Sequence, residues 1–304
     1  MDGAAKTVLS YYAWIRAEDA VKLKRLGTAA PPIPLSSYKH ISSIRHNRYV
    51  AFERELELAA SMAQEAGALA LDYQRRGITA ETKDDESPVT AADRACEKLI
   101  VERIAQTYPD DGVLGEEGSN RPSGNGRKWI VDPIDGTRDF VRGIPLWAVL
   151  IGFEENGAVV AGAAHCPGQQ LLLTANKGGG AWQNGQRLQV SKISSADQAV
   201  LCFNGFNKKG VAGMNGLLDW VEPFWAVRGL GGAVDAMLVA QGLADVWIEP
   251  NAKPWDFAPL KILVEEAGGV FGAFDGSNSI YQGNGYACTP ALEPYVKDLL
   301  KSIR

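Results

Sequence analysis

Histidine is nearly absent from this chain. The 304 residues include three, His40, His46 and His165, and two of these lie within the first 50 residues. A Ser-His-Asp triad or a histidine-rich metal site therefore has almost no material from which to form. Hydrolytic chemistry would have to use carboxylates, whose oxygens are suitable ligands for hard cations such as Mg²⁺.

Other absences narrow the class of protein. The chain has no run of about 18 apolar residues, so we expect no membrane-spanning helix. Its four cysteines are scattered without a CxxC pair, which argues against a disulfide framework or a zinc site and favours reduced thiols in a cytoplasmic protein. The net charge of −5 argues against non-specific binding to nucleic acid. Hydrophobic residues make up 46% of the chain, which is enough for a sizeable core.

The N-terminal region differs in charge from the rest. Residues 1–50 contain eight Lys or Arg and three acidic residues, so their net charge is +5 and that of the remainder is −10. We expect residues 1–48 to form a loosely attached extension and residues 49–304 to form the folded domain. Glu18 and Asp19 argue against a transit peptide, which is poor in acids, although organellar targeting by the extension stays open.

The order of predicted elements indicates a mixed fold. Apolar residues at helical spacing predict helices over 50–75 and 90–107. Residues 146–190 instead predict a β-meander, with hairpin turns at Asn156-Gly157 and Asn184-Gly185. Beyond the meander we expect a strand at 199–203, a helix at 212–220, a strand at 224–228, a helix at 233–242, a strand at 244–249, a helix at 256–267, a strand at 270–274 and a helix at 291–303.

The segment WIVDPIDGTRDF, residues 129–140, places two carboxylates directly after a buried strand. Asp132 ends the apolar run at the edge where α/β folds place their sites, and Asp135 follows across a proline turn. Gly136 and Thr137 then begin a new segment, whose backbone N–H groups can hold an anion. Two aspartates that converge beside an anion site are tolerated when a cation lies between them. The local alternative makes Asp135 an N-cap and Asp132 a turn former.

Three more acidic turns lie at the ends of predicted elements. Glu116 follows a short strand in LGEEG, and its alternative is a solvated turn. Asp256 begins the helix of WDFAPL, where it could be an N-cap with Pro259 in the first turn. Asp93 forms a capping box with Thr90 by spacing, and from the residues alone we favour that interpretation over catalysis. Each carboxylate can be explained singly, but four such turns in a chain so poor in histidine favour a shared cation site.

The motifs VTAAD, GEEG, WIVDPIDGT, VWIEP and WDFAPLKILVEEAGG occur in this order, and the series resembles the inositol monophosphatase family over roughly residues 50–303. The resemblance implies a layered αβαβα sandwich of the inositol monophosphatase and fructose-1,6-bisphosphatase type. Its α+β half would cover about 49–205 and its α/β half about 206–304. It also implies Mg²⁺-dependent hydrolysis of a small phosphorylated polyol or amino alcohol by a homodimer, with no nucleic-acid or membrane partner.

The resemblance assigns a role to each motif residue. Asp93 and Thr137 would position and deprotonate the attacking water, and the N–H groups of Gly136 and Thr137 would hold the phosphate. Asp235 and Glu249 would contact a hydroxyl or amine of the substrate. More than one Mg²⁺ ion is expected, held by Glu116, Asp132, the carbonyl of Ile134, Asp135 and Asp256.

The identity of the phosphate ester stays open. FVRGIPLW at 140–147 and IEPNAKPWD at 249–256 resemble the histidinol-phosphate phosphatase branch. That branch often has an aspartate at the position of Gly232, whereas the small residues 231–233 resemble the inositol branch. The leading candidates are inositol-1-phosphate and histidinol phosphate.

A different enzyme class is the remote alternative. GLGGAV, residues 229–234, lies between a predicted strand and a predicted helix and imitates a dinucleotide-binding fingerprint. Val234 replaces the third glycine, however, and the segment lies late in the chain. Close packing of the backbone explains these glycines equally well, so a nucleotide-binding oxidoreductase is the weaker hypothesis.

Overall fold

The computed structural model describes residues 51–77, 80–82, 88–204 and 217–302. All of them belong to the larger of the chain's two units, Asn47–Arg304. The extension expected over 1–48 and most of the helix expected over 212–220 lie outside the described residues. Within the described ranges, no helix has the length and apolar character needed to cross a membrane.

The larger sheet contains the predicted meander. Its eight strands have the order β10-β9-β8-β7-β6-β5-β3-β4, and β6 to β9 are consecutive antiparallel neighbours. Asn156 and Asn184 have φ of 51° and 47° and are each followed by a glycine of positive φ, as expected for tight hairpins. The strands are β3 (Gly112–Gly115), β4 (Asn120–Arg121), β5 (Arg127–Asp135), β6 (Ala148–Glu155), β7 (Ala158–Cys166), β8 (Leu171–Asn176), β9 (Gly180–Gln183) and β10 (Gln186–Arg187).

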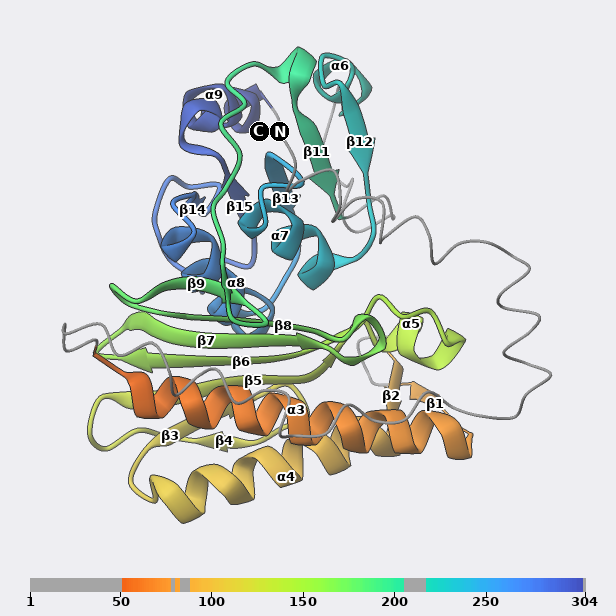
Figure 1. Cartoon of the computed structure of the whole chain (residues 1–304), viewed down its shortest axis with the longest axis vertical. Helices are drawn as coiled ribbons and strands as arrows, with labels where there is room; N and C mark the ends of the chain where they lie inside the picture. The colour runs from red at the N-terminus through yellow and green to blue at the C-terminus, as the bar shows by residue number, and fades with distance from the viewer. Residues whose placement is uncertain (1–50, 78–79, 83–87, 205–216, 303–304) are drawn as a thin grey trace. The chain divides into compact units, whose positions relative to one another are not determined.

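Helices cover both faces of this sheet (Figure 1). The two expected N-terminal helices are α3 (Glu53–Arg76) and α4 (Ala91–Thr107), and they bury an apolar face against one side, around Trp129 and Phe153. A two-stranded sheet of β1 (Ala80–Thr82) and β2 (Pro88–Thr90) leads into α4. The opposite side packs on α7 (Gly232–Ala240) and α8 (Pro254–Glu266), which form the middle helical layer.

The smaller sheet has five strands in the order β12-β11-β13-β15-β14. One side faces α7 and α8, and the other packs on the C-terminal helix α9 (Glu293–Ser302) and on Trp220 of α6 (Leu217–Val221). The five layers therefore alternate as αβαβα, which confirms the predicted fold (Figure 1). The strands are β11 (Val200–Phe203), β12 (Ala226–Arg228), β13 (Val246–Glu249), β14 (Val270–Gly272) and β15 (Gly285–Cys288).

Two glycines bring α8 unusually close to the larger sheet. Gly152 of β6 and Gly162 of β7 pair directly across the strands. A Cβ atom at Gly152 would lie 2.6 Å from the Cβ of Ala258, and one at Gly162 would lie 2.8 Å from the Cα of Pro259. Only residues without a side chain permit this approach. The start of α8 is thereby held against the sheet, on the side that the candidate site occupies.

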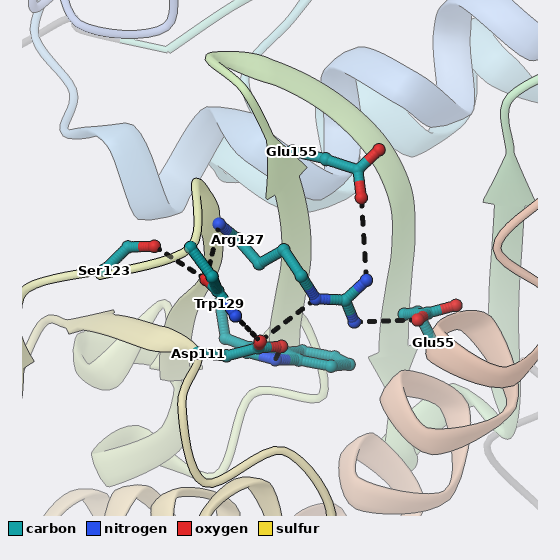
Figure 2. Close-up of polar contacts among 7 residues, drawn as sticks. Glu55, Asp111, Ser123, Arg127, Trp129 and Glu155 are labelled. Carbon is teal, nitrogen blue, oxygen red and sulfur yellow. Dashed lines mark hydrogen bonds and ion pairs between the residues drawn. The ribbon is translucent and has the colours of Figure 1, made fainter.

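An ionic cluster fixes the opposite end of β5. Figure 2 shows Arg127 surrounded by Glu55 of α3, Asp111 and Glu155. The guanidinium lies 2.8 Å from Glu55, 3.0 Å from Asp111 and 3.5 Å from Glu155. Asp111 also accepts a hydrogen bond from the indole N–H of Trp129 at 3.0 Å. The cluster joins α3 to the sheet at the end of β5 opposite to the end that carries Asp132.

Candidate active site

Three aspartates from two elements converge at the C-terminal end of β5. One carboxylate oxygen from each of Asp132, Asp135 and Asp256 lies within 4.8 Å of the other two. The first two come from β5 and the third from the first turn of α8. Asp132 is 1% exposed, whereas Asp135 and Asp256 are partly exposed. The structure thus brings together three of the predicted metal ligands.

A β-bulge explains how Asp132 and Asp135 reach the same side of the sheet. Residues three apart on a regular strand point to opposite faces. Here the pairing with β6 moves from Asp132 opposite Leu150 to Asp135 opposite Ala148, so β5 contains one extra residue. The strand runs through Asp135 and does not end at Asp132 as expected. Nor is Asp135 an N-cap, because Gly136 occupies that position of helix α5 (Thr137–Arg142).

Asp256 is also not an N-cap. Helix α8 begins at Pro254 with Lys253 as its cap residue, so Asp256 is the third helical residue. Its carboxylate accepts a hydrogen bond from the Lys253 N–H at 2.7 Å. Pro259 consequently lies inside the helix and not in the first turn, where the sequence had placed it. The close approach of α8 at Gly152 and Gly162 sets the position of this carboxylate.

The carboxylates of this cluster repel one another unless a cation lies among them. Burial, with added repulsion from Glu116 and Asp135, raises the pKa of Asp132 well above its ordinary value. Burial also raises the pKa of Asp135 to about 7 and, together with the charge of Asp135, that of Asp256 to about 8. Such a cluster is satisfied either by protons or by a cation. Because every donor is a carboxylate oxygen, the residues fit a hard divalent ion.

Glu116 approaches the cluster from the neighbouring strand. It follows β3, which runs parallel to β5, and its N–H donates to the carbonyl of Val131 at 3.1 Å. Its charge contributes to the raised pKa values of Asp132 and Asp135. The fourth predicted carboxylate is therefore electrostatically part of the same site. The Ile134 carbonyl lies nearby, 3.2 Å from the hydroxyl of Thr137.

Asp93 forms the predicted capping box and also contacts Thr137. Its Oδ2 accepts the N–H of Thr90 at 2.8 Å, and the Thr90 hydroxyl caps α4 in return, which is the predicted capping box. The other oxygen, Oδ1, lies 3.3 Å from the Oγ1 of Thr137. Burial raises the pKa of Asp93, which strengthens this carboxylate as a proton acceptor. One side chain thus caps a helix with one oxygen and contacts Thr137 with the other.

Glu249 and Asp135 both lie close to Gly232, and Glu249 is hydrogen-bonded to Asn204, a residue that was not identified from the sequence. Glu249 ends β13, is 5% exposed, and accepts a hydrogen bond from Asn204 Nδ2 at 2.6 Å. An ideal Cβ at Gly232 would lie 3.5 Å from Asn204 Nδ2, 3.6 Å from Glu249 and 3.7 Å from Asp135. Asn204 directly follows β11, so its position at a strand end was the available signal.

Asp235 lies in the first turn of α7, is fully buried, and its Oδ1 accepts the N–H of Leu230 at 3.0 Å. Its charge adds to the raised pKa of Asp135, and its contact with substrate stays a prediction. The hydrogen bond to Leu230 stabilises the turn before α7. The glycine-rich segment 229–234 has a similar explanation, because the N–H of Ala233 donates to Asp135 at 3.1 Å and Gly232 packs close to carboxylates. Neither contact suits the pyrophosphate of a dinucleotide.

The chain is similar to proteins that are named as phosphatases. A histidinol-phosphatase of Chlorobaculum parvum is 42% identical over 76% of this chain and 90% of its own length. An inositol monophosphatase of Dictyostelium discoideum is 34% identical over 73% of this chain and 85% of its own length.

Solved structures share the fold. The suhB protein of Bartonella henselae superimposes with a TM-score of 0.77 at 30% identity, covering 82% of this chain and 98% of its own. A Thermotoga maritima IMPase gives a TM-score of 0.75 at 29% identity, with the same coverage of 82% and 98%. A profile of the inositol monophosphatase family matches residues 53–303. The family profile covers most of the chain, and relatives that match most of its length are named as phosphatases. The chain therefore belongs to the inositol monophosphatase family and is a phosphoric monoester hydrolase.

Proposed function

We propose that this enzyme hydrolyses a compact phosphate monoester with the help of Mg²⁺. The observation that carries the proposal is the convergence of Asp132, Asp135 and Asp256 within 4.8 Å, with pKa values raised by burial and mutual repulsion. A divalent cation relieves the repulsion between these carboxylates, because it replaces the protons that they would otherwise retain.

The chain's own residues would hold the ions and the substrate. The predicted ligands for Mg²⁺ are Glu116, Asp132, Asp135, Asp256 and the carbonyl of Ile134. When bound, Mg²⁺ polarises phosphoryl oxygens and lowers the pKa of a coordinated water. The N–H groups of Gly136 and Thr137, at the start of α5, would orient the phosphate.

Thr137 and Asp93 would accept the proton of the attacking water. The Thr137 hydroxyl can accept the water's proton at Oγ1 while it passes its own proton to Oδ1 of Asp93, 3.3 Å away. Asp93 is fixed for this role because its other oxygen is bound by Thr90. The water's oxygen is left free to attack phosphorus, and the proton ends on a buried carboxylate.

Histidinol phosphate and inositol-1-phosphate are the two candidate substrates, and the identities of the relatives favour histidinol phosphate. Relatives named histidinol-phosphatase from Chlorobaculum parvum, Mycobacterium tuberculosis and Streptomyces coelicolor share 42%, 37% and 35% identity with the chain. The inositol monophosphatase relatives of Dictyostelium discoideum and Bos taurus share 34% and 33%. The carboxylate of Glu249 could accept a hydrogen bond either from the amine of histidinol phosphate or from a hydroxyl of inositol-1-phosphate. Inositol-1-phosphate is therefore the second candidate.

The deciding experiment measures phosphate release from both esters with and without millimolar Mg²⁺. We expect turnover of histidinol phosphate that requires Mg²⁺ and is lost in Asp132→Asn, whose circular dichroism spectrum should remain that of the wild type. Higher kcat/KM for inositol-1-phosphate would reverse the order of the two substrates. Failure to hydrolyse either ester, or full activity of Asp132→Asn, would contradict the proposal.

A further inference from the structure

Glu97 is a buried carboxylate outside the set of residues assigned to catalysis. It lies on α4, is 3% exposed, and points at the turn that follows β3. Its Oε2 accepts the N–H of Glu117 at 2.7 Å, and its Oε1 accepts the N–H of Ser119 at 2.9 Å. Both oxygens are therefore engaged by the backbone of a single turn.

The same turn is shaped to fit this carboxylate. A Cβ atom at Gly115 would lie 2.6 Å from the Cδ of Glu97 and 2.9 Å from its Oε1. Any side chain at position 115 would therefore push the carboxylate away. Gly115 is needed here for packing and not for an unusual backbone conformation, because its φ lies outside the left-handed region.

Glu116 lies between the two points of attachment. On one side its N–H is bound to the carbonyl of Val131 in β5 at 3.1 Å. On the other side Glu97 holds the next residue, Glu117, and packs on the preceding residue, Gly115. The backbone that carries the Glu116 carboxylate is consequently held from the sheet and from α4 at once.

Helix α4 also carries Asp93, one turn before Glu97. Residues four apart on a helix lie on the same face, and both of these side chains are buried. One helix therefore contacts both Thr137, through Asp93, and the Glu116 turn, through Glu97. Movement of α4 would displace the proton acceptor and a metal ligand together.

We propose that Glu97 is a positioning residue for the metal site, one that holds Glu116 in the geometry required for a divalent cation. The inference rests on the proposed function, since it assumes that Glu116 binds Mg²⁺. In this role Glu97 acts through the backbone of the turn, because each of its oxygens accepts an N–H of that turn. Groups that orient metal ligands in this way typically change metal affinity by about 10–100-fold when they are removed.

Two substitutions in the full-length enzyme separate the effect of the position of the Glu97 carboxylate from the effect of its charge. Glu97→Gln keeps the shape of the side chain but turns one oxygen into an amide nitrogen, which faces an N–H and cannot accept it. Gly115→Ala keeps the charge of Glu97 but displaces its carboxylate. We expect both variants to bind Mn²⁺, followed by electron paramagnetic resonance, about 10–100-fold more weakly than the wild type. Their kcat at saturating Mg²⁺ should stay close to the wild-type value, and the Mg²⁺ concentration for half-maximal activity should rise.

The matched control is Glu102→Gln on the same helix, which removes an exposed carboxylate 3.9 Å from Lys98 and should leave Mn²⁺ binding unchanged. Wild-type affinity in both test variants would overturn the inference. Weakened binding in Glu97→Gln alone would also overturn it, because the effect would then come from charge. If Glu97→Gln does not fold, Gly115→Ala decides the question. Absence of Mn²⁺ binding by the wild type would instead refute the proposed function, and this inference with it.

Discussion

Replacing Asp256 by asparagine should stabilise the metal-free protein while it removes activity. In the free site, burial together with the charge of Asp135 raises the pKa of Asp256 from 3.8 to about 8. Asparagine retains an oxygen that can accept the Lys253 N–H, which lies 2.7 Å from the carboxylate, but it removes the charge. We therefore expect Asp256→Asn to melt at a higher temperature in EDTA and to lose both stabilisation by Mg²⁺ and turnover.

The size of the effect follows from the pKa difference between folded and unfolded chain. Each unit corresponds to about 1.4 kcal/mol. A shift from 3.8 to about 8 sets an upper limit of roughly 6 kcal/mol for the cost of ionising Asp256 in the fold. Asp256 is partly exposed, so solvent screens part of this cost and we expect about half, roughly 3 kcal/mol. In a domain of this size that corresponds to about 6–12 °C in melting temperature.

The dependence on pH has a definite sign. The folded state keeps the proton of Asp256 up to about pH 8, whereas the unfolded chain releases it near 3.8. Metal-free wild type should therefore lose stability as pH rises from about 4 to about 8, and Asp256→Asn should lose less. Thermal melts in EDTA across this range measure the difference. Equal melting temperatures at every pH, or full turnover of the variant with Mg²⁺, would refute the reasoning.

Two further substitutions test the proton acceptor and the ionic cluster. Thr137→Ala should lower kcat by about 10²–10⁴-fold, the usual contribution of general-base catalysis, without weakening Mn²⁺ binding; a defect mainly in metal binding would contradict the role of Thr137. Because burial raises the pKa of Asp93, the fall of kcat on acidification should begin at a higher pH than for an ordinary aspartate. Arg127→Met should lower the free energy of unfolding by about 3–5 kcal/mol, since it leaves Asp111 buried without its cation. Its control, Arg94→Met, breaks an exposed pair and should cost about 1 kcal/mol or less in the same urea titration.

The order of elements was predictable because it depends on local patterns. Helical spacing located α3 and α4, and the Asn-Gly turns located the hairpins of the larger sheet. The strand β15 was missed because Gly285–Cys288 is short, follows a glycine-rich loop and has no alternation of polar and apolar residues. Its place between β13 and β14 depends on pairing across the fold, which no local pattern encodes.

The site was predictable in its residues but not in its geometry. The motifs supplied Asp132, Asp135 and Asp256 because acidic residues stood out at the ends of apolar runs. The orientation of Asp235 could not be read in this way, because it depends on where the turn before α7 places its N–H groups. Glu97 looked like any polar residue of a helix, since its partners belong to a turn 20 residues away.

The extra residue in β5 means that the length of the segment from Asp132 to Asp135 matters as much as its composition. Asp132 and Asp135 face α8 together because one additional residue shifts the alternation between them. Deleting a single residue there would preserve both acids and the strand, yet would turn one carboxylate toward α3 and α4. Between the two acids, at Pro133 and Ile134, natural and engineered variants should therefore accept replacements more readily than insertions or deletions.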